Sequence, residues 1–216
     1  AQGRFNRSES GDATLQILDR QLQQAADQEK PGIEEQMGIV TEDANRDRQQ
    51  AIELHQTAFM LYRDGDSRDD LLQARFLQSY LYLKLGAFRE AIAIADVILR
   101  TNRGSDMVLK AGMIELQALT QLIDGSPSEK QAEWIPLLKG LVTRLVEIAP
   151  GTPESDQAVN VLVSLAMREK QWDQAEEYFK LKPTLGGPKE FLLGRVRWAQ
   201  YRQNMYAHRQ GGTAET

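Results

Sequence analysis

The side chains that most often carry out catalysis are scarce and scattered in this 216-residue chain. It contains no cysteine, which excludes a thiolate nucleophile, a disulfide framework and any Cys-based zinc or iron–sulfur site. Its two histidines, His55 and His208, lie far apart in the sequence, and neither belongs to an HExxH-like motif. Adjacent carboxylates such as Glu34-Glu35 point to different sides of a helix, unlike a working acid–base pair. We therefore expect no catalytic residues, no metal site and no cofactor.

An acidic segment from Asp64 to Asp70 has the alternating carboxylates of a calcium-binding loop. Two arginines argue against that interpretation, because Arg68 stands at a ligand position and Arg75 stands where the bidentate glutamate is needed. The segment is better explained as the end of one helix, at Asp64-Gly65, followed by the N-cap of the next at Ser67.

Arginines alternate with aromatic residues near the C-terminus, in the segment RVRWAQYRQNMYAHR. Arg195, Arg197 and Arg202 there could contact phosphates while the aromatic rings stack on bases, so binding to nucleic acid or to an anionic surface is the alternative function. The overall net charge of −5 and the pI near 5.2 weigh against it. A second alternative is an all-helical hydrolase, although no nucleophile or base can be named.

Charge is unevenly distributed along the chain. The first 70 residues contain 15 acidic and 8 basic side chains, a net charge of −7, whereas residues 188–209 carry +4. This asymmetry is compatible with a binding surface, and equally with solvated helix faces.

The spacing of apolar residues predicts helices throughout and no sheet. We expect a flexible N-terminus over residues 1–11 and an N-terminal helical hairpin over 12–66, with Lys30-Pro31-Gly32 as a break and Thr41 as the cap of its second helix. A capping helix over 188–209 precedes a flexible tail over 210–216. The apolar stripe expected to cover the core comprises Phe191, Gly194, Trp198, Tyr201 and Met205.

The region 67–187 is expected to consist of three helical hairpins, over 67–104, 105–151 and 152–187. Within the middle one, Pro136 should kink or interrupt the second helix, which we expect to be firm from Leu137 to Ile148. About nine helices result, and short connections favour antiparallel neighbours, so the fold class is all-α.

The clearest of these hairpins resembles a tetratricopeptide repeat. In SYLYLKLGAFREAIAIADVIL, the positions that carry the resemblance are Tyr82, Gly86, Phe88, Ala91 and Ile98. A second copy over residues 156–183 contributes Leu162 and, within its segment LAMREKQWDQAEEYF, Trp172, Ala175 and Phe179, with Lys170 in place of the turn glycine. The spacing between the copies implies a middle repeat with an insertion between Asp124 and Pro136. The resemblance implies a right-handed α-solenoid of stacked antiparallel hairpins.

In proteins of this family the first helix of each repeat lines a concave groove that binds a partner, so the resemblance implies a non-catalytic protein-interaction module or scaffold. The corresponding positions are Gln73, Phe76, Tyr80, Leu83 and Lys84 in the first repeat, Lys110, Ile114 and Gln117 in the second, and Asn160, Ser164, Met167 and Arg168 in the third.

Packing against neighbouring helices is the alternative for the apolar members Phe76, Tyr80, Leu83 and Ile114. Some family members bind a C-terminal carboxylate through a lysine and asparagine clamp. Phe76 and Tyr80 occupy two of those positions, so we expect no clamp and a partner that binds by apolar or aromatic anchors.

The longest apolar stretch, Ala91 to Leu99, contains Asp96 and is shorter than the roughly 20 residues that cross a bilayer. We expect no membrane span within this chain. It begins Ala1-Gln2-Gly3 without a methionine, which favours an exported, periplasmic protein, with the cytoplasm as the alternative.

Overall fold

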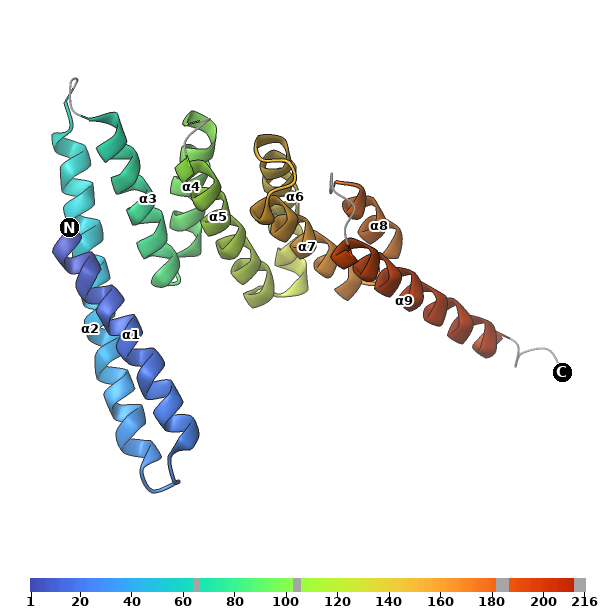
Figure 1. Ribbon diagram of the computed structural model, residues 1–216, viewed down its shortest axis with the longest axis horizontal. Helices are drawn as coiled ribbons and strands as arrows, with labels where there is room; N and C mark the ends of the chain where they lie inside the picture. Colours follow the sequence, from blue (N-terminus) through green and yellow to red (C-terminus); the bar gives the residue numbers. More distant parts are fainter. Residues whose placement is uncertain (64–66, 103–105, 182–186, 212–216) are drawn as a thin grey trace. The chain divides into compact units, whose positions relative to one another are not determined.

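The computed structural model describes residues 1–63, 67–102, 106–181 and 187–211. Within the last of these ranges, side chains are described for residues 193–206 alone. The described residues form nine helices and no strand, which confirms the all-α class (Figure 1). No helix among them is both long and apolar enough to cross a membrane. The helices are α1 Gln2–Gln24, α2 Lys30–Leu61, α3 Arg68–Lys84, α4 Phe88–Thr101, α5 Asp106–Gly125, α6 Ser128–Ile148, α7 Pro153–Arg168, α8 Trp172–Lys180 and α9 Gly187–Gly211.

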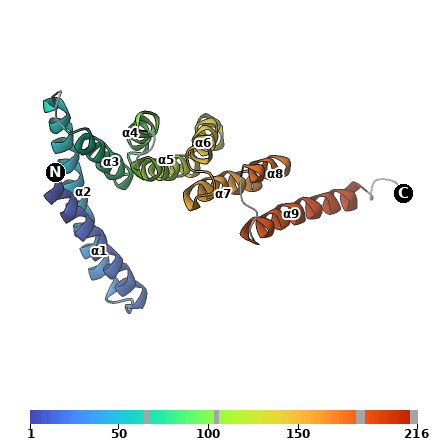
Figure 2. The same ribbon diagram turned by 45° about the horizontal axis from the view of Figure 1, so that its top comes forward.

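The helices divide between two compact units, Ala1–Thr101 and Asn102–Thr216. In the first unit α1 packs along α2, and α3 packs on both α2 and α4. In the second unit each helix from α5 to α9 packs on the next, and α5 also touches α7. Figures 1 and 2 show these neighbours side by side from two directions.

The N-terminal hairpin differs from the sequence prediction at both of its ends. The predicted flexible N-terminus 1–11 is wrong, because α1 begins at Gln2 and is held to α2 by ion pairs from Arg4 and Arg7 to Asp47, 2.6 and 3.3 Å long. The predicted break at Lys30-Pro31-Gly32 instead opens α2, since a proline in the first turn lacks only an N–H that has no helical partner there. Thr41 lies inside α2, where its hydroxyl donates to the Met37 carbonyl at 2.7 Å.

The α1–α2 contact is close because small residues face each other. A Cβ built on Gly11 would lie 2.9 Å from the Cβ of Ala44, so the two backbones approach more closely there than any larger residue permits. Ala51 and Ile52 continue the buried face of α2 and meet Leu81 of α3, which is fully buried. The hairpin is thereby attached to the helices that follow it.

The α3–α4 hairpin forms as its sequence predicts. Ser67 caps α3, its hydroxyl oxygen accepting from the Asp70 N–H at 3.2 Å. Gly86 adopts φ +73° in the turn, and Ala91 is fully buried where α4 packs. The acidic segment from Asp64 to Asp70 falls partly on residues 64–66, which lie outside the described residues.

The α7–α8 turn repeats the α3–α4 turn without a glycine. Lys170 adopts φ 58°, and Gln171 donates its N–H to the Ala166 carbonyl at 2.8 Å. Ala87 donates to Tyr82 at 2.9 Å in the equivalent place after Gly86. Both turns therefore end their helices with the same hydrogen bond, from the third residue beyond the helix to its last turn.

Pro136 lies inside α6 and does not interrupt it, so the predicted interruption is wrong. The helix runs without a break from Ser128 to Ile148. Pro136 is exposed, and so is Ala132, whose carbonyl loses its helical donor. Water can satisfy that carbonyl, so the continuous helix is tolerated.

The stripe predicted to cover the core from α9 is wrong. Among the side chains of this helix that the structure describes, Val196 is fully buried, whereas Trp198 and Tyr201 are 61% and 56% exposed. Polar contacts instead join α9 to α8: the Trp172 indole donates to Gln203, and the Gln200 amide donates to Asp173 at 3.3 Å. Of the remaining members, Gly194 is exposed, Met205 is half-buried, and the side chain of Phe191 lies outside the description.

Candidate functional site

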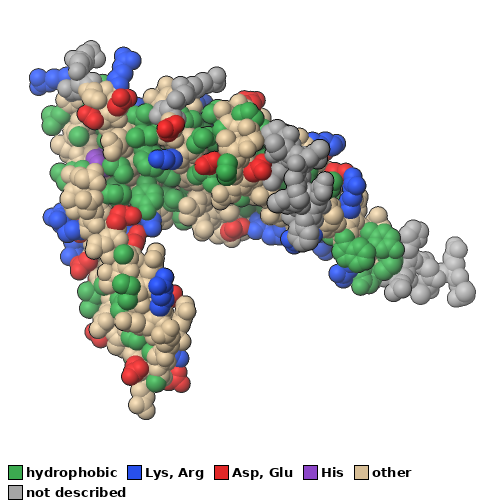
Figure 3. Space-filling view, in the orientation of Figure 1, with side chains coloured by type: hydrophobic (Ala, Val, Ile, Leu, Met, Phe, Trp, Pro, Cys, Tyr) green, Lys and Arg blue, Asp and Glu red, His purple; other side chains and the backbone are tan. Residues whose placement is uncertain are grey.

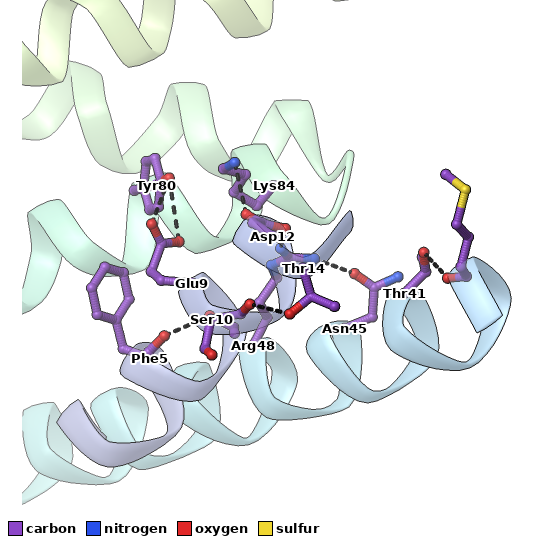
Figure 4. Close-up of polar contacts among 12 residues, drawn as sticks. Phe5, Glu9, Ser10, Asp12, Thr14, Thr41, Asn45, Arg48, Tyr80 and Lys84 are labelled. Atoms are coloured by element: carbon purple, nitrogen blue, oxygen red, sulfur yellow. Dashed lines mark hydrogen bonds and ion pairs between the residues drawn. The ribbon is translucent and has the colours of Figure 1, made fainter. Parts of the chain in front are cut away.

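Two of the predicted groove residues on α3 are engaged by the chain's own α1. The Tyr80 hydroxyl donates to the Glu9 carboxylate at 3.4 Å, and its ring meets Phe5 edge-on with centroids 6.1 Å apart (Figure 4). Lys84 donates to Asp12 at 2.9 Å, and its ammonium lies 5.5 Å from the Tyr80 ring centroid. This part of α3 is an internal contact surface.

A shared carboxylate organises that surface. Asp12 accepts from Lys84 of α3 and from Arg48 of α2, a buried arginine that also donates to Asn45 (Figure 4). Burial opposes ionisation of Asp12, but the hydrogen bonds from Lys84 and Arg48 outweigh it and hold the pKa of Asp12 below its ordinary value. Burial likewise disfavours the Lys84 cation, yet the Asp12 hydrogen bond raises the pKa of Lys84. Burial raises the pKa of Tyr80.

The other three predicted residues of α3 divide between surface and core. Gln73 is exposed and Phe76 is half-buried. Leu83 is buried, so for this residue the alternative of core packing is correct. The same holds for Ile114 of α5, which is 6% exposed. Neither the Leu83 nor the Ile114 side chain is therefore available to a partner.

A pocket of about 350 Å³ lies between α5, α6 and α7 within the second unit. Its floor is apolar and buried, formed by Ile123, Leu138 and Leu165. Its remaining lining is polar or partly exposed and consists of Thr120, Asp124, Gln157, Asn160, Val161, Ser164 and Arg168. An apolar floor with a few polar groups around it is the usual composition of a binding pocket.

Three residues predicted from the third repeat line this pocket: Asn160, Ser164 and Arg168. They recur at intervals of four on α7, so they share one helix face. Met167 is half-buried on α7 outside the lining, and Lys110 and Gln117 are exposed on α5 outside it. The structure therefore brings three of the four third-repeat residues together at the pocket, and none of the second-repeat residues lines it.

Sequence reasoning missed the contributions of α5 and α6 to the pocket. Thr120, Ile123 and Asp124 lie at the end of α5, beyond the positions that the repeat register indicated, and Leu138 comes from α6. The helical spacing of Gln117, Thr120 and Asp124, at intervals of three and four, would have extended the predicted face by two turns. Nothing in the sequence indicated Leu138.

The polar atoms that line the pocket differ in whether they have a hydrogen-bond partner. Arg168 donates to Asp124 at 2.6 Å, closing an ion pair between the ends of α7 and α5. The Thr120 hydroxyl donates to the Leu116 carbonyl at 2.8 Å. The Oδ1 atom of Asn160 is buried and has no hydrogen-bond partner in the structure. A buried acceptor without a donor is costly, so a ligand that supplies an N–H there gains affinity.

The lining offers little for acid–base chemistry. Its ionisable side chains, Asp124 and Arg168, are paired with each other. Within the described part of the chain, no group of three or more His, Asp or Glu side chains is arranged to hold a metal ion. His55 lies elsewhere, buried in α2, where burial lowers its pKa. The side chain of His208 lies outside the description.

Arg195, Arg197 and Arg202 of α9 are all exposed, but they do not share one face. Arg195 and Arg202 are seven residues apart and lie on the same side of the helix, whereas Arg197 lies on another side and donates to Glu176 of α8 at 3.0 Å. The guanidinium of Arg202 lies 5.8 Å from the centroid of the Tyr206 ring.

Comparisons with protein-family models, with curated proteins and with solved structures found no match to this chain.

Proposed function

We propose that this chain is a non-catalytic protein-interaction module, a right-handed solenoid of tetratricopeptide-like repeats, that holds a partner segment in the pocket between α5 and α7. The observation that carries the proposal is this pocket, with its apolar floor of Ile123, Leu138 and Leu165 and the unpartnered Oδ1 of Asn160. An apolar or aromatic side chain of the partner fills the floor.

The chemistry of the rim favours a peptide over a small charged metabolite. The ion pair between Asp124 and Arg168 neutralises the charges at the pocket mouth, so no net charge is presented to a ligand. Asn160 accepts one N–H, which a peptide backbone supplies next to its anchor side chain. Gln157 and Ser164 are exposed at the mouth and can bond the neighbouring peptide groups.

Two features support the repeat interpretation. Successive helices pack on each other within each unit, as stacked hairpins do. The turns at Gly86 and Lys170 have the same backbone conformation and the same closing hydrogen bond at equivalent places in two hairpins.

A display library of random 12-residue peptides, selected on the immobilised chain, tests the proposal. We expect the selected peptides to share an aromatic or large aliphatic residue and to lose affinity more than about tenfold, measured by fluorescence anisotropy, when Ser164→Trp fills the pocket mouth. Asn160→Leu, which removes the buried acceptor, should weaken binding about fivefold. Thr143→Trp, at an exposed position of α6 outside the pocket, is the matched control. Peptides that bind the Ser164→Trp variant as tightly as the unchanged chain would contradict the proposal.

A further inference from the structure

Two exposed helix faces, one on each unit, combine a large apolar side chain with charged residues on either side. On α2 the face consists of Glu35, Ile39 and Glu42, spaced by four and then three residues, and Ile39 is 56% exposed. On α9 it consists of Arg195, Trp198 and Arg202, spaced by three and then four. Residues at these intervals lie on the same side of a helix. One face is acidic and the other is basic.

Neither face is used by the packing within its own unit. The opposite side of α2, which includes Ala44 and Arg48, is buried against α1. On α9, Val196 is buried, and Gln200 and Gln203 make the contacts to α8. In Figure 3 the hydrophobic side chains of α9 are visible as an uncovered patch on that helix.

The two faces match in an antiparallel register. When Ile39 is set opposite Trp198, Glu35 falls opposite Arg202 and Glu42 falls opposite Arg195, because the four-then-three spacing of one face is the reverse of the three-then-four spacing of the other. Each guanidinium then meets a carboxylate, the pairing for which its planar fork is suited. The apolar pair lies between two charge pairs, which cover it from water.

The neighbouring positions in this register are also compatible. Tyr206 falls opposite Pro31, and Tyr201 falls opposite Gln36, all of them exposed. Gly32 and Gly38 of α2 have open space where a side chain would stand, so a second helix can approach closely. Tyr201 stacks on Trp198 with centroids 5.8 Å apart, which widens the aromatic surface that Ile39 meets.

We propose that α9 of one copy of this chain docks antiparallel on α2 of a second copy through these residues. Charge complementarity favours this occupant, since the first 70 residues carry −7 and residues 188–209 carry +4. Trp, Tyr and Arg are also the residues that dominate the energy of protein interfaces. A long polyanion such as nucleic acid meets the same two arginines, but the chain's net charge of −5 repels it.

The contact is heterologous, because two different surfaces of the chain meet. Two copies can satisfy both surfaces reciprocally in a closed dimer, or each can bind a further copy in an open chain. Both arrangements give a mass that rises with protein concentration and falls with added salt.

Sedimentation velocity of the full chain from about 1 to 300 µM tests the proposal, since this range spans the affinities of weak and moderate contacts. We expect self-association that Ile39→Asp weakens more than about tenfold, because a carboxylate then faces Trp198 in a desolvated contact. Ile17→Asp on α1 is the matched control, since Ile17 is also 56% exposed but lies on a different helix, and it should leave the association unchanged.

Charge exchange gives a second, independent readout. Glu35→Arg with Glu42→Arg in one chain, or Arg195→Glu with Arg202→Glu in another, should each abolish self-association by placing like charges together. An equimolar mixture of these two double variants should associate again, because each acidic face then meets a basic one. Circular dichroism melting verifies that all variants are folded.

Three results would overturn the proposal: a chain that stays monomeric at every concentration, association that Ile39→Asp and Ile17→Asp weaken equally, or a mixture of the double variants that stays monomeric. Binding of a labelled oligothymidine of about 20 nucleotides that depends on Arg195 and Arg202, without self-association, would assign the α9 face to nucleic acid instead.

Discussion

At the scale of single residues, Asp12 is a side chain that joins three helices of the first unit. It bonds a cation from each of two other helices, Arg48 of α2 and Lys84 of α3. The side chain of Arg48 is 5% exposed, and its Nε atom has no hydrogen-bond partner in the structure. Loss of the carboxylate would leave a buried guanidinium with little compensation, and buried charges without partners are strongly destabilising.

Replacing Asp12 with Asn should therefore lower the free energy of unfolding by about 2–4 kcal/mol, measured by urea denaturation at neutral pH. Asp19→Asn is the control, because Asp19 is an exposed carboxylate on the same helix, and its replacement should cost less than about 0.5 kcal/mol. Equal losses of unfolding free energy for the two variants would show that Asp12 stabilises the fold no more than an exposed carboxylate does.

The effect of Asp12→Asn should also depend on pH in one direction. The pKa of Asp12 in the folded chain lies below its ordinary value of 3.8, so its ionised form stabilises the fold fully above 3.8. That stabilisation is lost as the pH falls through the lowered folded-state pKa. The difference between the unchanged chain and the variant should accordingly shrink in acid below pH 3.8, in urea titrations repeated at successive pH values. A constant difference would contradict this.

Residue-level prediction from the sequence succeeded where the repeat register was sound and failed where a distant segment intervened. The register placed Asn160, Ser164 and Arg168 on one face, and they line the pocket. It gave no sign that Tyr80 and Lys84 would be contacted by Glu9 and Asp12. No local pattern reports a contact between residues that lie 71 or 72 positions apart in the chain.

At the scale of helices, the sequence predicted the number and kind of elements better than their ends. Ser67 and Gly86 mark helix boundaries through local hydrogen bonds and backbone conformation, so they could be identified from the chain itself. The start of α1 at Gln2 depends on ion pairs to Asp47, and the exposure of Trp198 depends on polar contacts between α8 and α9. Those are tertiary effects, which periodicity cannot reveal.

The α5–α6 pair provides a steric test at this scale. A Cβ built on Gly112 would lie 2.5 Å from Cδ2 of Leu145, a fully buried side chain that would have to shift. Gly112→Ala should therefore lower the free energy of unfolding by about 1–2 kcal/mol, since the overpacking outweighs the gain in helix propensity.

Gly140→Ala is the matched control on α6. Gly140 is an exposed helical position with no atom within 4 Å of a built Cβ, so alanine there should stabilise the chain by up to about 1 kcal/mol. Thermal melting of both variants measures whether each substitution stabilises or destabilises the chain. A stabilising Gly112→Ala would show that the two helices are not in close contact at this glycine.

At the scale of the whole molecule, the division between Thr101 and Asn102 predicts that a destabilising substitution loosens only the unit in which it lies. Asp12→Asn should accelerate amide hydrogen exchange in residues 1–101 and leave α5 to α8 unchanged, whereas Gly112→Ala should do the reverse. Exchange followed by mass spectrometry of proteolytic peptides measures both. If each variant accelerated exchange equally throughout, the chain would unfold as a single cooperative unit.

The turn at Lys170 bears on how repeats of this kind can be found. Gly86 and Lys170 hold the same left-handed conformation and are followed by the same closing hydrogen bond, although only the glycine adopts that conformation without steric cost. The geometry of the hairpin is therefore imposed by the packing of its two helices, with Ala91 and Ala175 fully buried at corresponding places. A sequence search that requires glycine at the turn would pass over such a repeat, whereas a pattern built on the small buried alanine and the spacing around it would retain it.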